Sequence, residues 1–489
     1  MNYEAVIGLE IHTELATETK LFCSCSAHAF GAEPNVNICP ACCGMPGTLP
    51  RLNRRAVELG MKAGLLLGCR INAVSAFDKK NYFYPDLPSG YQLTQWFSPI
   101  ASDGHLDIDI SDNGAVNYGK TRLKRIGIKQ IHIEEDAGKL IHGGGHTLVD
   151  MNRSGVPLIE IVTRPDLSTA EEVEGFLDRL RTLLRFARIS GAVMAKGELR
   201  CDVNLSVRPA DSEVSGVRVE LKNMNSVEAI KKAIKYETER HIRALMGEGE
   251  PIVPESRGWD EKKEESFSMR AKESAADYRY FPDSNVPPLR IDGEWLSSIR
   301  AELPELPEEK KRRYTEEYGL SNYDASQLAS SLALCDCFED AVKVSDSPKD
   351  AVNWLLSEVM SEMNTRGIPR DELPLSGEAL GKLILLTRSG RISRASARRI
   401  LPVLFDHPNT DPAEYAEGNG LTVTADVDLL YKTAREAVSA DPKSVADYLG
   451  GKDKALMALF GRCMKALKGN CDPIALREAL LHVINGDRN

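Results

Sequence analysis

The chain has 489 residues, of which 42% are hydrophobic and 27% charged, and its formal net charge is −10. This length exceeds one compact core, so we expect about two to four globular domains. No apolar run approaches the ~20 residues that cross a bilayer, and the first residues do not resemble a signal peptide, so we predict a cytoplasmic protein without a membrane segment. Because the net charge is negative, nucleic acid would have to bind local basic patches.

The first predicted element is a strand over residues 6–15, because its apolar and polar residues alternate with a period of two. Its polar side carries Glu10, His12 and Glu14. If these groups are partly buried, a cation or hydrogen-bond donors must offset their desolvation. For this stretch alone, a solvent-exposed polar face is the simpler interpretation.

A group of cysteines follows this strand. Five of the 11 cysteines fall in residues 23–43, as a Cys-Ser-Cys pair and a Cys-Pro-Ala-Cys-Cys group. Two thiolate pairs joined by a loop are typical of a tetrahedral structural zinc site, whereas reduced thiols are the alternative. Cys42 is preferred to Cys43, because Cys-x-x-Cys is the usual zinc spacing. The predicted zinc ligands are Cys23, Cys25, Cys39 and Cys42.

The next segments alternate between helix, loop and strand. Residues 54–67 form a predicted helix, and residues 81–95 a predicted loop, because they combine aromatic residues with two prolines and a glycine. A strand-like run within 125–141 contains three acids at 134–136, which form either a solvated turn or oxygen ligands for a hard cation. Glycines 143–145 predict a hairpin turn only.

The clearest strand pair follows a helix that begins with a capping box at 168–171 and runs to about residue 189. Residues 198–208 and 217–222 both alternate, and a turn-rich connection joins them, so we expect an antiparallel hairpin. Its polar face is either a solvated ion-pair ladder or a site where cations hold phosphate and carboxylates hold a metal. A helix over 226–246 follows.

Strand signals almost vanish from about residue 293, and a second interruption rich in Pro, Asn and Gly falls near 405–420. We therefore predict an α+β domain followed by helical domains, with the bounds 1–292, 293–405 and 406–489. Two basic stretches in the helical part are either solvated surface or contacts for a polyanion. The first stretch has Arg391, Arg394 and Arg398 on one face of a predicted helix. The second stretch contains Lys465 and Lys468.

Seven longer motifs occur in a fixed order along the chain. They are Gly8-Leu-Glu-Ile-His12, Asn81-Tyr-Phe-Tyr-Pro-Asp86, His132-Ile-Glu-Glu-Asp-Ala-Gly-Lys139, Asn152-Arg-Ser-Gly-Val-Pro-Leu-Ile-Glu-Ile161, Leu199-Arg-Cys-Asp-Val-Asn204, Glu220-Leu-Lys-Asn-Met-Asn-Ser226 and Asp277-Tyr-Arg-Tyr-Phe-Pro282. With these motifs the chain resembles, over essentially its whole length, the B subunits of the tRNA-dependent Glu-tRNA(Gln)/Asp-tRNA(Asn) amidotransferases.

The resemblance implies a fold and an activity. The fold is a cradle-like α+β kinase domain on antiparallel strands with a zinc-binding insert at 23–43, then a helical domain and a small YqeY-like tail that binds tRNA. The activity is ATP-dependent phosphorylation of the side-chain carboxylate of Glu or Asp misacylated on tRNA(Gln) or tRNA(Asn), after which ammonia displaces the phosphate. A partner amidase (A) subunit would supply the ammonia through a tunnel, and a small C subunit would complete a heterotrimer. The implied cofactors are ATP, Mg²⁺ and structural Zn²⁺.

The motifs also imply roles for particular residues. For catalysis they imply Glu10, His12, Glu135, Asp202 and Glu220, of which all but Asp202 would hold Mg²⁺. Contacts to ATP or phosphate are implied for Arg200, Asn204, Lys222, Asn223 and Arg279. An imidazole is an unusual magnesium ligand, so His12 could instead orient a water or bind phosphate. Glu134 is the alternative beside Glu135. We predict that five basic residues of the helical part contact tRNA, namely Arg391, Arg394, Arg398, Lys465 and Lys468.

Two departures and two alternatives accompany the resemblance. Ser89 stands where many relatives have lysine, and Glu198 replaces a commonly small residue, so neither receives a role. One alternative is a non-catalytic zinc-containing tRNA-binding subunit whose acids are surface charge; convergence of Glu10, Glu135, Asp202 and Glu220 in one cleft would argue against it. The other is the archaeal glutamine-specific E-type subunit, which has an inserted domain for which residues 282–303 leave no room.

Overall fold

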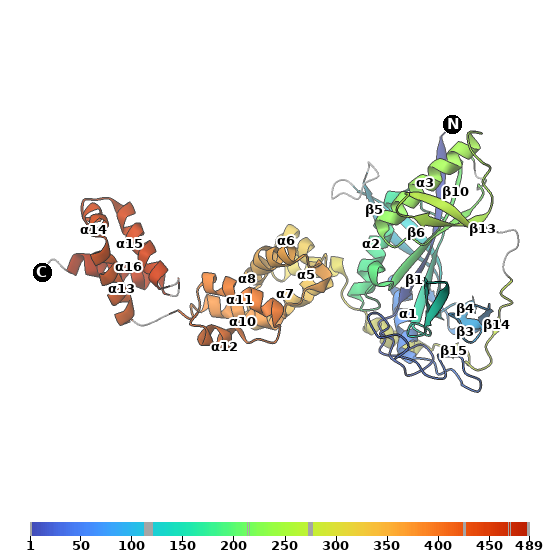
Figure 1. The fold of residues 1–489 in the computed structure, drawn as a ribbon, viewed down its shortest axis with the longest axis horizontal. Helices are drawn as coiled ribbons and strands as arrows, with labels where there is room; N and C mark the ends of the chain where they lie inside the picture. Colours follow the sequence, from blue (N-terminus) through green and yellow to red (C-terminus); the bar gives the residue numbers. More distant parts are fainter. Residues whose placement is uncertain are drawn as a thin grey trace. The chain divides into compact units, whose positions relative to one another are not determined.

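The computed structural model describes residues 2–111, 121–212, 214, 216–271, 277–423, 427–467, 469 and 471–486. The chain divides into two compact units, Met1–Leu306 and Pro307–Asn489, which are described separately (Figure 1). Among the described residues, no helix combines the length and the apolar character needed to cross a membrane.

The first unit combines strands with a few helices. Its helices are α1 (Arg54–Leu66), α2 (Ala170–Phe186), α3 (Val227–Leu245) and α4 (Gly293–Ala301), with a short 3₁₀ turn at Met194–Lys196. Its strands are β1 (Tyr3–Glu14), β2 (Arg70–Ile71), β3 (Val74–Asn81), β4 (Tyr91–Ser98), β5 (Ala101–Ser111), β6 (Thr121–Glu135), β7 (Lys139–Gly143), β8 (His146–Asp150), β9 (Pro157–Thr163), β10 (Leu199–Pro209), β11 (Val219–Lys222), β12 (Glu255–Asp260), β13 (Glu265–Ala271), β14 (Phe281–Pro282) and β15 (Leu289–Arg290).

The strands other than β7 and β8 form one 13-stranded sheet among the described residues. Its main order is β13-β12-β11-β10-β1-β9-β6-β4-β3-β14, and its pairs are antiparallel except for β11 with β12. This arrangement confirms a mixed α/β unit built mainly on antiparallel strands. The predicted loop over 81–95 is wrong at its end, because residues 91–95 belong to β4 and pair with β3.

The two faces of the sheet differ in chemistry, as the alternation in β1 predicts. Ile7, Leu9 and Ile11 are fully buried in one core with apolar residues of α1, α2 and α3. Glu10 and His12 lie on the opposite face. Helices α2 and α3 accordingly lie alongside the sheet in Figure 1. The helix-covered face is therefore the core, and the opposite face is available for chemistry.

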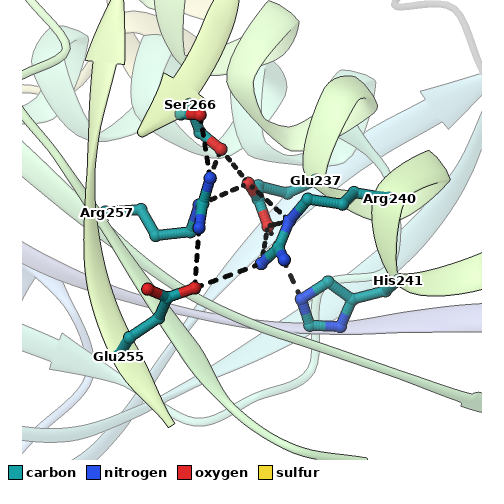
Figure 2. Close-up of polar contacts among 6 residues, drawn as sticks. All are labelled: Glu237, Arg240, His241, Glu255, Arg257 and Ser266. Atoms are coloured by element: carbon teal, nitrogen blue, oxygen red, sulfur yellow. Dashed lines mark hydrogen bonds and ion pairs between the residues drawn. The ribbon is translucent and has the colours of Figure 1, made fainter. Parts of the chain in front are cut away.

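A buried ion-pair network connects α3 to β12 and β13 on the helix-covered side (Figure 2). Glu237 is fully buried; its carboxylate lies 2.9 Å from Arg240 and 3.1 Å from Arg257 and accepts a hydrogen bond from Ser266. Arg257 also lies 2.7 Å from Glu255. Each buried charge in this network thus has a partner of opposite charge, which offsets the free energy of removing it from water. The network anchors the β12–β13 end of the sheet.

We expect Glu237→Gln to lower the local free energy of unfolding by about 3 kcal/mol, because Arg240 and Arg257 then lose a buried counter-charge. Hydrogen exchange of β12 and β13 in the full chain measures this loss. Glu239→Gln, an exposed position on the same helix, is the matched control. Equal protection in the two variants would contradict a stabilising network.

The same carboxylate predicts sensitivity to acid. Burial would raise the pKa of Glu237, but hydrogen bonds from His241, Arg240 and Ser266 lower it from 4.5 to about 2. The Glu237 carboxylate therefore binds a proton less tightly in the folded chain than in the unfolded chain. Its contribution to the free energy of unfolding is complete above about pH 4.5 and is lost as the pH falls towards 2.

The second unit is helical. Its helices are α5 (Pro307–Glu316), α6 (Asn322–Leu328), α7 (Leu332–Ser345), α8 (Pro348–Trp354), a π-helical turn (Leu355–Val359), α9 (Met360–Arg366), a 3₁₀ turn (Arg370–Glu372), α10 (Gly377–Arg388), α11 (Arg394–Asp406), α12 (Pro412–Gly418), α13 (Val427–Ala440), α14 (Pro442–Leu449), α15 (Asp453–Ala466) and α16 (Pro473–Gly486). Residues of α13, α15 and α16 share one hydrophobic core. The first unit extends past the predicted boundary at 292/293, because α4 packs on α1 and Lys62 lies 2.8 Å from Glu302.

Candidate functional site

A polar cleft of about 370 Å³ lies on the open face of the sheet, and this volume is in the usual range of small-ligand sites. Strands β1, β3, β4, β6, β9, β10 and β11 contribute to it, together with the segment after β11. Its charged and polar lining residues are His12, Lys80, Tyr82, Gln92, Glu134, Asp136, Arg200, Asp202, Lys222, Asn223 and Asn225. The cleft therefore combines carboxylates with cations, as phosphate chemistry with a metal requires.

Three side chains at the centre of this face could hold a metal ion. One ligand atom each of Glu10, His12 and Glu160 lies within 4.8 Å of the others. The register explains their meeting: Glu10 and His12 are two residues apart on β1, and Glu160 lies opposite His12 on β9. Glu134 on β6 joins them, with its carboxylate 3.4 Å from His12 Nε2. We refer to these four residues as the carboxylate cluster.

The electrostatics of the carboxylate cluster show an excess of negative charge. Burial and the neighbouring Glu134 raise the pKa of Glu160. Burial would lower the pKa of His12, but Glu134, Glu160 and Glu10 outweigh it and raise this pKa. A cation at this position would relieve the repulsion between the carboxylates. Carboxylate oxygens are also the donors that Mg²⁺ prefers, so the residues fit that ion.

A second wall is formed by β10 and β11. The Lys222 ammonium contacts the Asp202 carboxylate and lies 2.9 Å from Glu220, which also accepts a 2.7 Å hydrogen bond from Ser256. Asn204 lies opposite Glu220 in the ladder. Lys222 therefore bridges Asp202 and Glu220, and Asp202 stands opposite Glu10 in the β1–β10 ladder, so this wall belongs to the same face.

Arg200 on β10 connects to the segment after β6 through an ion pair with Asp136. Its guanidinium lies 2.6 Å from the buried Asp136 carboxylate, which Arg153 also approaches at 3.4 Å. Arg200 lies opposite His12 in the β1–β10 ladder, so its positive charge faces the carboxylate cluster. Glu14, two residues further along β1, lies close enough to Asp136 that burial and this carboxylate raise its pKa to about 7.

Two of the predicted metal ligands, Glu135 and Glu220, lie outside the carboxylate cluster; Glu220 is on β11, where it pairs with Lys222. Glu135 lies on the other side of the sheet, where it accepts a 3.0 Å hydrogen bond from Leu93 and lies near Cys42. Consecutive strand residues point to opposite faces, so Glu134 is the acid that faces the cleft. Arg279 is 84% exposed and lies 3.8 Å from Asp277. Asn223 is exposed at the rim of the cleft.

Sequence reasoning missed Glu160 and Asp136 as site residues. Both were present in motifs that carried the family resemblance, but no strand was predicted over residues 157–163. The signal there is weak, because Glu160 shares its face of β9 with the apolar Leu158 and Val162, so no apolar–polar alternation marks this segment as a strand with a polar face.

The insert after β1 brings four thiols together. The Sγ atoms of Cys23, Cys25, Cys39 and Cys42 lie within 4.8 Å of one another. Lys20 is buried beside them and donates a 3.5 Å hydrogen bond to Cys42 Sγ. Four thiolates in one cluster are the donor set of a structural zinc site, so the residues fit zinc.

The basic stretches are partly neutralised in the folded chain. The prediction that Arg391 shares a helical face with Arg394 and Arg398 is wrong, because Arg391 precedes α11; it pairs with Glu417 at 2.8 Å. Arg394 and Arg398 do share a face, but both lie within 3 Å of Glu358. Lys465 is exposed on α15, and Lys468 lies outside the described residues.

Comparison with protein-family models covers both units. The model of the GatB/GatE catalytic domain matches residues 5–297, so it includes the sheet and its cleft. The model of the GatB domain matches residues 336–484, so it includes most of the helical unit.

Individual relatives match over the full chain. The B subunit of the aspartyl/glutamyl-tRNA(Asn/Gln) amidotransferase of Caldicellulosiruptor saccharolyticus is 46% identical over 98% of each chain. Proteins of the same name are 44% identical in Carboxydothermus hydrogenoformans, over 98% of each chain, and in Thermotoga maritima, over 100% of each chain. These names favour the B-type over the E-type alternative. The chain therefore belongs to the family of aspartyl/glutamyl-tRNA(Asn/Gln) amidotransferase B subunits.

Proposed function

We propose that this chain uses ATP to phosphorylate the side-chain carboxylate of Glu or Asp misacylated on tRNA, and that ammonia then displaces the phosphate. The observation that carries the proposal is the convergence of Glu10, His12 and Glu160 within 4.8 Å, with Arg200 opposite His12 on the neighbouring strand β10. Acids that were only surface charge would not gather around one imidazole, and His12, Glu134 and Asp202 line the polar cleft together with Arg200 and Lys222. Of the acids predicted to converge, Glu135 lies elsewhere, on the other side of the sheet. The convergence therefore argues against the non-catalytic alternative.

The chemistry needs no nucleophile from the protein. An oxygen of the substrate carboxylate bonds to the γ-phosphorus of ATP and ADP leaves; the nitrogen of ammonia then bonds to the acyl carbon and phosphate leaves. Charge neutralisation and positioning are what such a reaction requires. Glu10, His12, Glu134 and Glu160 would hold Mg²⁺, which when bound neutralises charge on the phosphate oxygens.

The second wall supplies fixed positive charge. Arg200 and Lys222 would hold phosphate oxygens, since guanidinium and ammonium groups form charge-assisted hydrogen bonds with them. Asp136, Asp202 and Glu220 hold these two cations in place before substrate arrives. In this proposal Asp202 and Glu220 position the cations and do not bind the metal.

The proposed reaction requires partners. The one thiol among the described lining residues of the polar cleft is Cys201, and burial raises its pKa well above the ordinary value, so it is not an activated nucleophile. Ammonia would therefore come from an amidase (A) subunit, with a C subunit completing a heterotrimer. The substrate is misacylated tRNA, which implies a cytoplasmic setting. The four cysteines would hold zinc.

Reconstitution tests the proposal. The full chain is combined with A and C subunits, ATP, Mg²⁺ and glutamine, and each misacylated tRNA is supplied in turn. We expect amidated aminoacyl-tRNA and ADP in equal amounts. Binding of tRNA without ADP formation would support the non-catalytic alternative instead.

We also expect Lys465→Ala to weaken tRNA binding and to reduce the slope of log affinity against log salt by about one, as for one lost phosphate contact. Arg394→Ala should change the slope less, because Glu358 already neutralises part of its charge. Filter binding over a range of salt concentrations measures both slopes. An unchanged slope for Lys465→Ala would mean that this patch is solvated surface.

A further inference from the structure

Aromatic side chains gather at one end of the open face. Trp96 on β4 stacks on Tyr280, with ring centroids 4.5 Å apart and 7° between the planes. Phe97 and Tyr278 make edge contacts with Tyr280 at 6.4 and 5.9 Å. We call these four residues the aromatic platform. Trp96 and Phe97 are 47% and 62% exposed, so part of each ring is open to a ligand, although Tyr280 covers one face of Trp96.

The aromatic platform borders the carboxylate cluster. Trp96 makes an edge contact of 6.3 Å with His132, which lies opposite Glu160 in the sheet. Tyr82, which contacts Tyr278 at 6.0 Å, lines the polar cleft itself. A ring stacked on the platform would therefore lie next to the reacting groups, on the β3–β4 side of the cleft.

Cations are interleaved with these rings. Lys80 Nζ lies 5.1 Å from the ring centre of Tyr278 and 5.9 Å from that of Tyr82. Arg279 is 84% exposed between Tyr278 and Tyr280. Aromatic rings that stack bases, alternating with cations that follow the phosphate backbone, are typical of single-stranded nucleic-acid sites.

The segment that carries the tyrosines is held before any ligand binds. The Asn81 side-chain amide donates to the carbonyls of Tyr278 and Arg279 at 3.1 and 2.9 Å, and its backbone N–H donates to Tyr278 at 3.0 Å. Arg279 has a φ of +47°, an uncommon backbone conformation that these bonds maintain. A preformed platform loses little entropy on binding.

We propose that the aromatic platform stacks the base of the unpaired terminal nucleotide of the tRNA, beside the carboxylate cluster where its aminoacyl group reacts. This inference rests on the proposed function. The base of ATP is the other possible occupant, but the phosphate-holding cations Arg200 and Lys222 lie on β10 and β11, across the cleft. The aromatic platform is therefore assigned to the unpaired terminal nucleotide of the tRNA.

The test uses the full chain and two RNAs: a complete tRNA, and the same tRNA without its unpaired 3′ nucleotides. We expect wild type to bind the complete tRNA about ten-fold more tightly at fixed salt, the effect of about one stacked base. Trp96→Leu should remove most of this preference, and Trp96→Phe should retain it. Phe30→Leu, which changes an exposed aromatic residue in the zinc insert, is the matched control.

Two results would overturn the inference. One is an undiminished preference in Trp96→Leu; the other is a loss of ATP affinity in that variant with the RNA preference intact, which would assign the platform to the base of ATP. Neither result affects the proposed phosphorylation, which Glu160→Gln tests through turnover.

A measurement on the wild-type chain does not depend on the stability of a variant. All four tryptophans lie within the described residues, and Trp96 is the exposed one. The complete tRNA should therefore quench tryptophan fluorescence more than the trimmed RNA does. Equal quenching by the two RNAs would overturn the inference.

Discussion

We expect Glu160→Gln to lower the rate of ATP-dependent amidation by about a thousand-fold, the scale of losing a key electrostatic contact in a charged transition state. The amide has the size of the carboxylate but lacks its negative charge. Glu160 is the residue that lies within 4.8 Å of both Glu10 and His12. Its loss therefore weakens the hold on Mg²⁺ while leaving the fold of β9 intact.

Three measurements separate this effect from damage to the fold. Mg²⁺ binding by calorimetry should be lost in Glu160→Gln but kept in Glu135→Gln, because Glu135 lies on the other side of the sheet. Glu4→Gln, at the far end of β1, should retain turnover. Glutamine hydrolysis by the reconstituted A subunit should persist in every variant. Amidation by Glu160→Gln within about ten-fold of wild type would rule out the proposed metal role.

We expect Cys39→Ser to lose bound zinc and to disorder the insert between β1 and α1. A serine hydroxyl is a poor zinc ligand, and a structural zinc ion contributes folding free energy directly. Cys43→Ser is the matched control, because Cys43 lies beside the four-thiol group but outside it. Metal analysis of both variants measures zinc content, and hydrogen exchange over residues 15–53 measures order.

Loss of zinc should also disturb the residues that line the polar cleft. Ser154 donates a 3.1 Å hydrogen bond to the Cys42 carbonyl, and Gly155 donates to the Asp136 carbonyl at 2.9 Å. Asp136 in turn holds Arg200. We therefore expect Cys39→Ser to reduce turnover as well, by less than Glu160→Gln does. Full zinc content in Cys39→Ser, or its loss in Cys43→Ser, would contradict the ligand assignment.

Local patterns were sufficient to predict four strands of the sheet, β1, β6, β10 and β11. Alternation in β1 and in the β10–β11 hairpin is a property of a few neighbouring residues, so the strands and their polar faces could be predicted directly. The pairing of Glu10 with Asp202 and of His12 with Arg200 then follows once β1 and β10 are neighbours. Nothing in either strand alone shows that they are adjacent.

The acids at 134–136 show where pattern reasoning was insufficient. The prediction selected Glu135, but β6 continues to that residue, and its parity directs Glu134 into the cleft. A difference of one residue changes the face, so a site prediction in a strand depends on its register. The basic helix shows the same limit, because Glu358 lies 36 residues before Arg394 in the sequence and yet neutralises it.

The sequence by itself determined the family, the helices α1, α2 and α3, the strands β1, β6, β10 and β11, and the four-cysteine group, because these depend on local periodicity, spacing and long ordered motifs. Only the tertiary structure decided which acids meet. Glu10, His12, Glu134 and Glu160 come from β1, β6 and β9, and their convergence depends on strand order and register. The same long-range packing decides which charges remain available to a ligand, because a partner distant in the sequence can neutralise them.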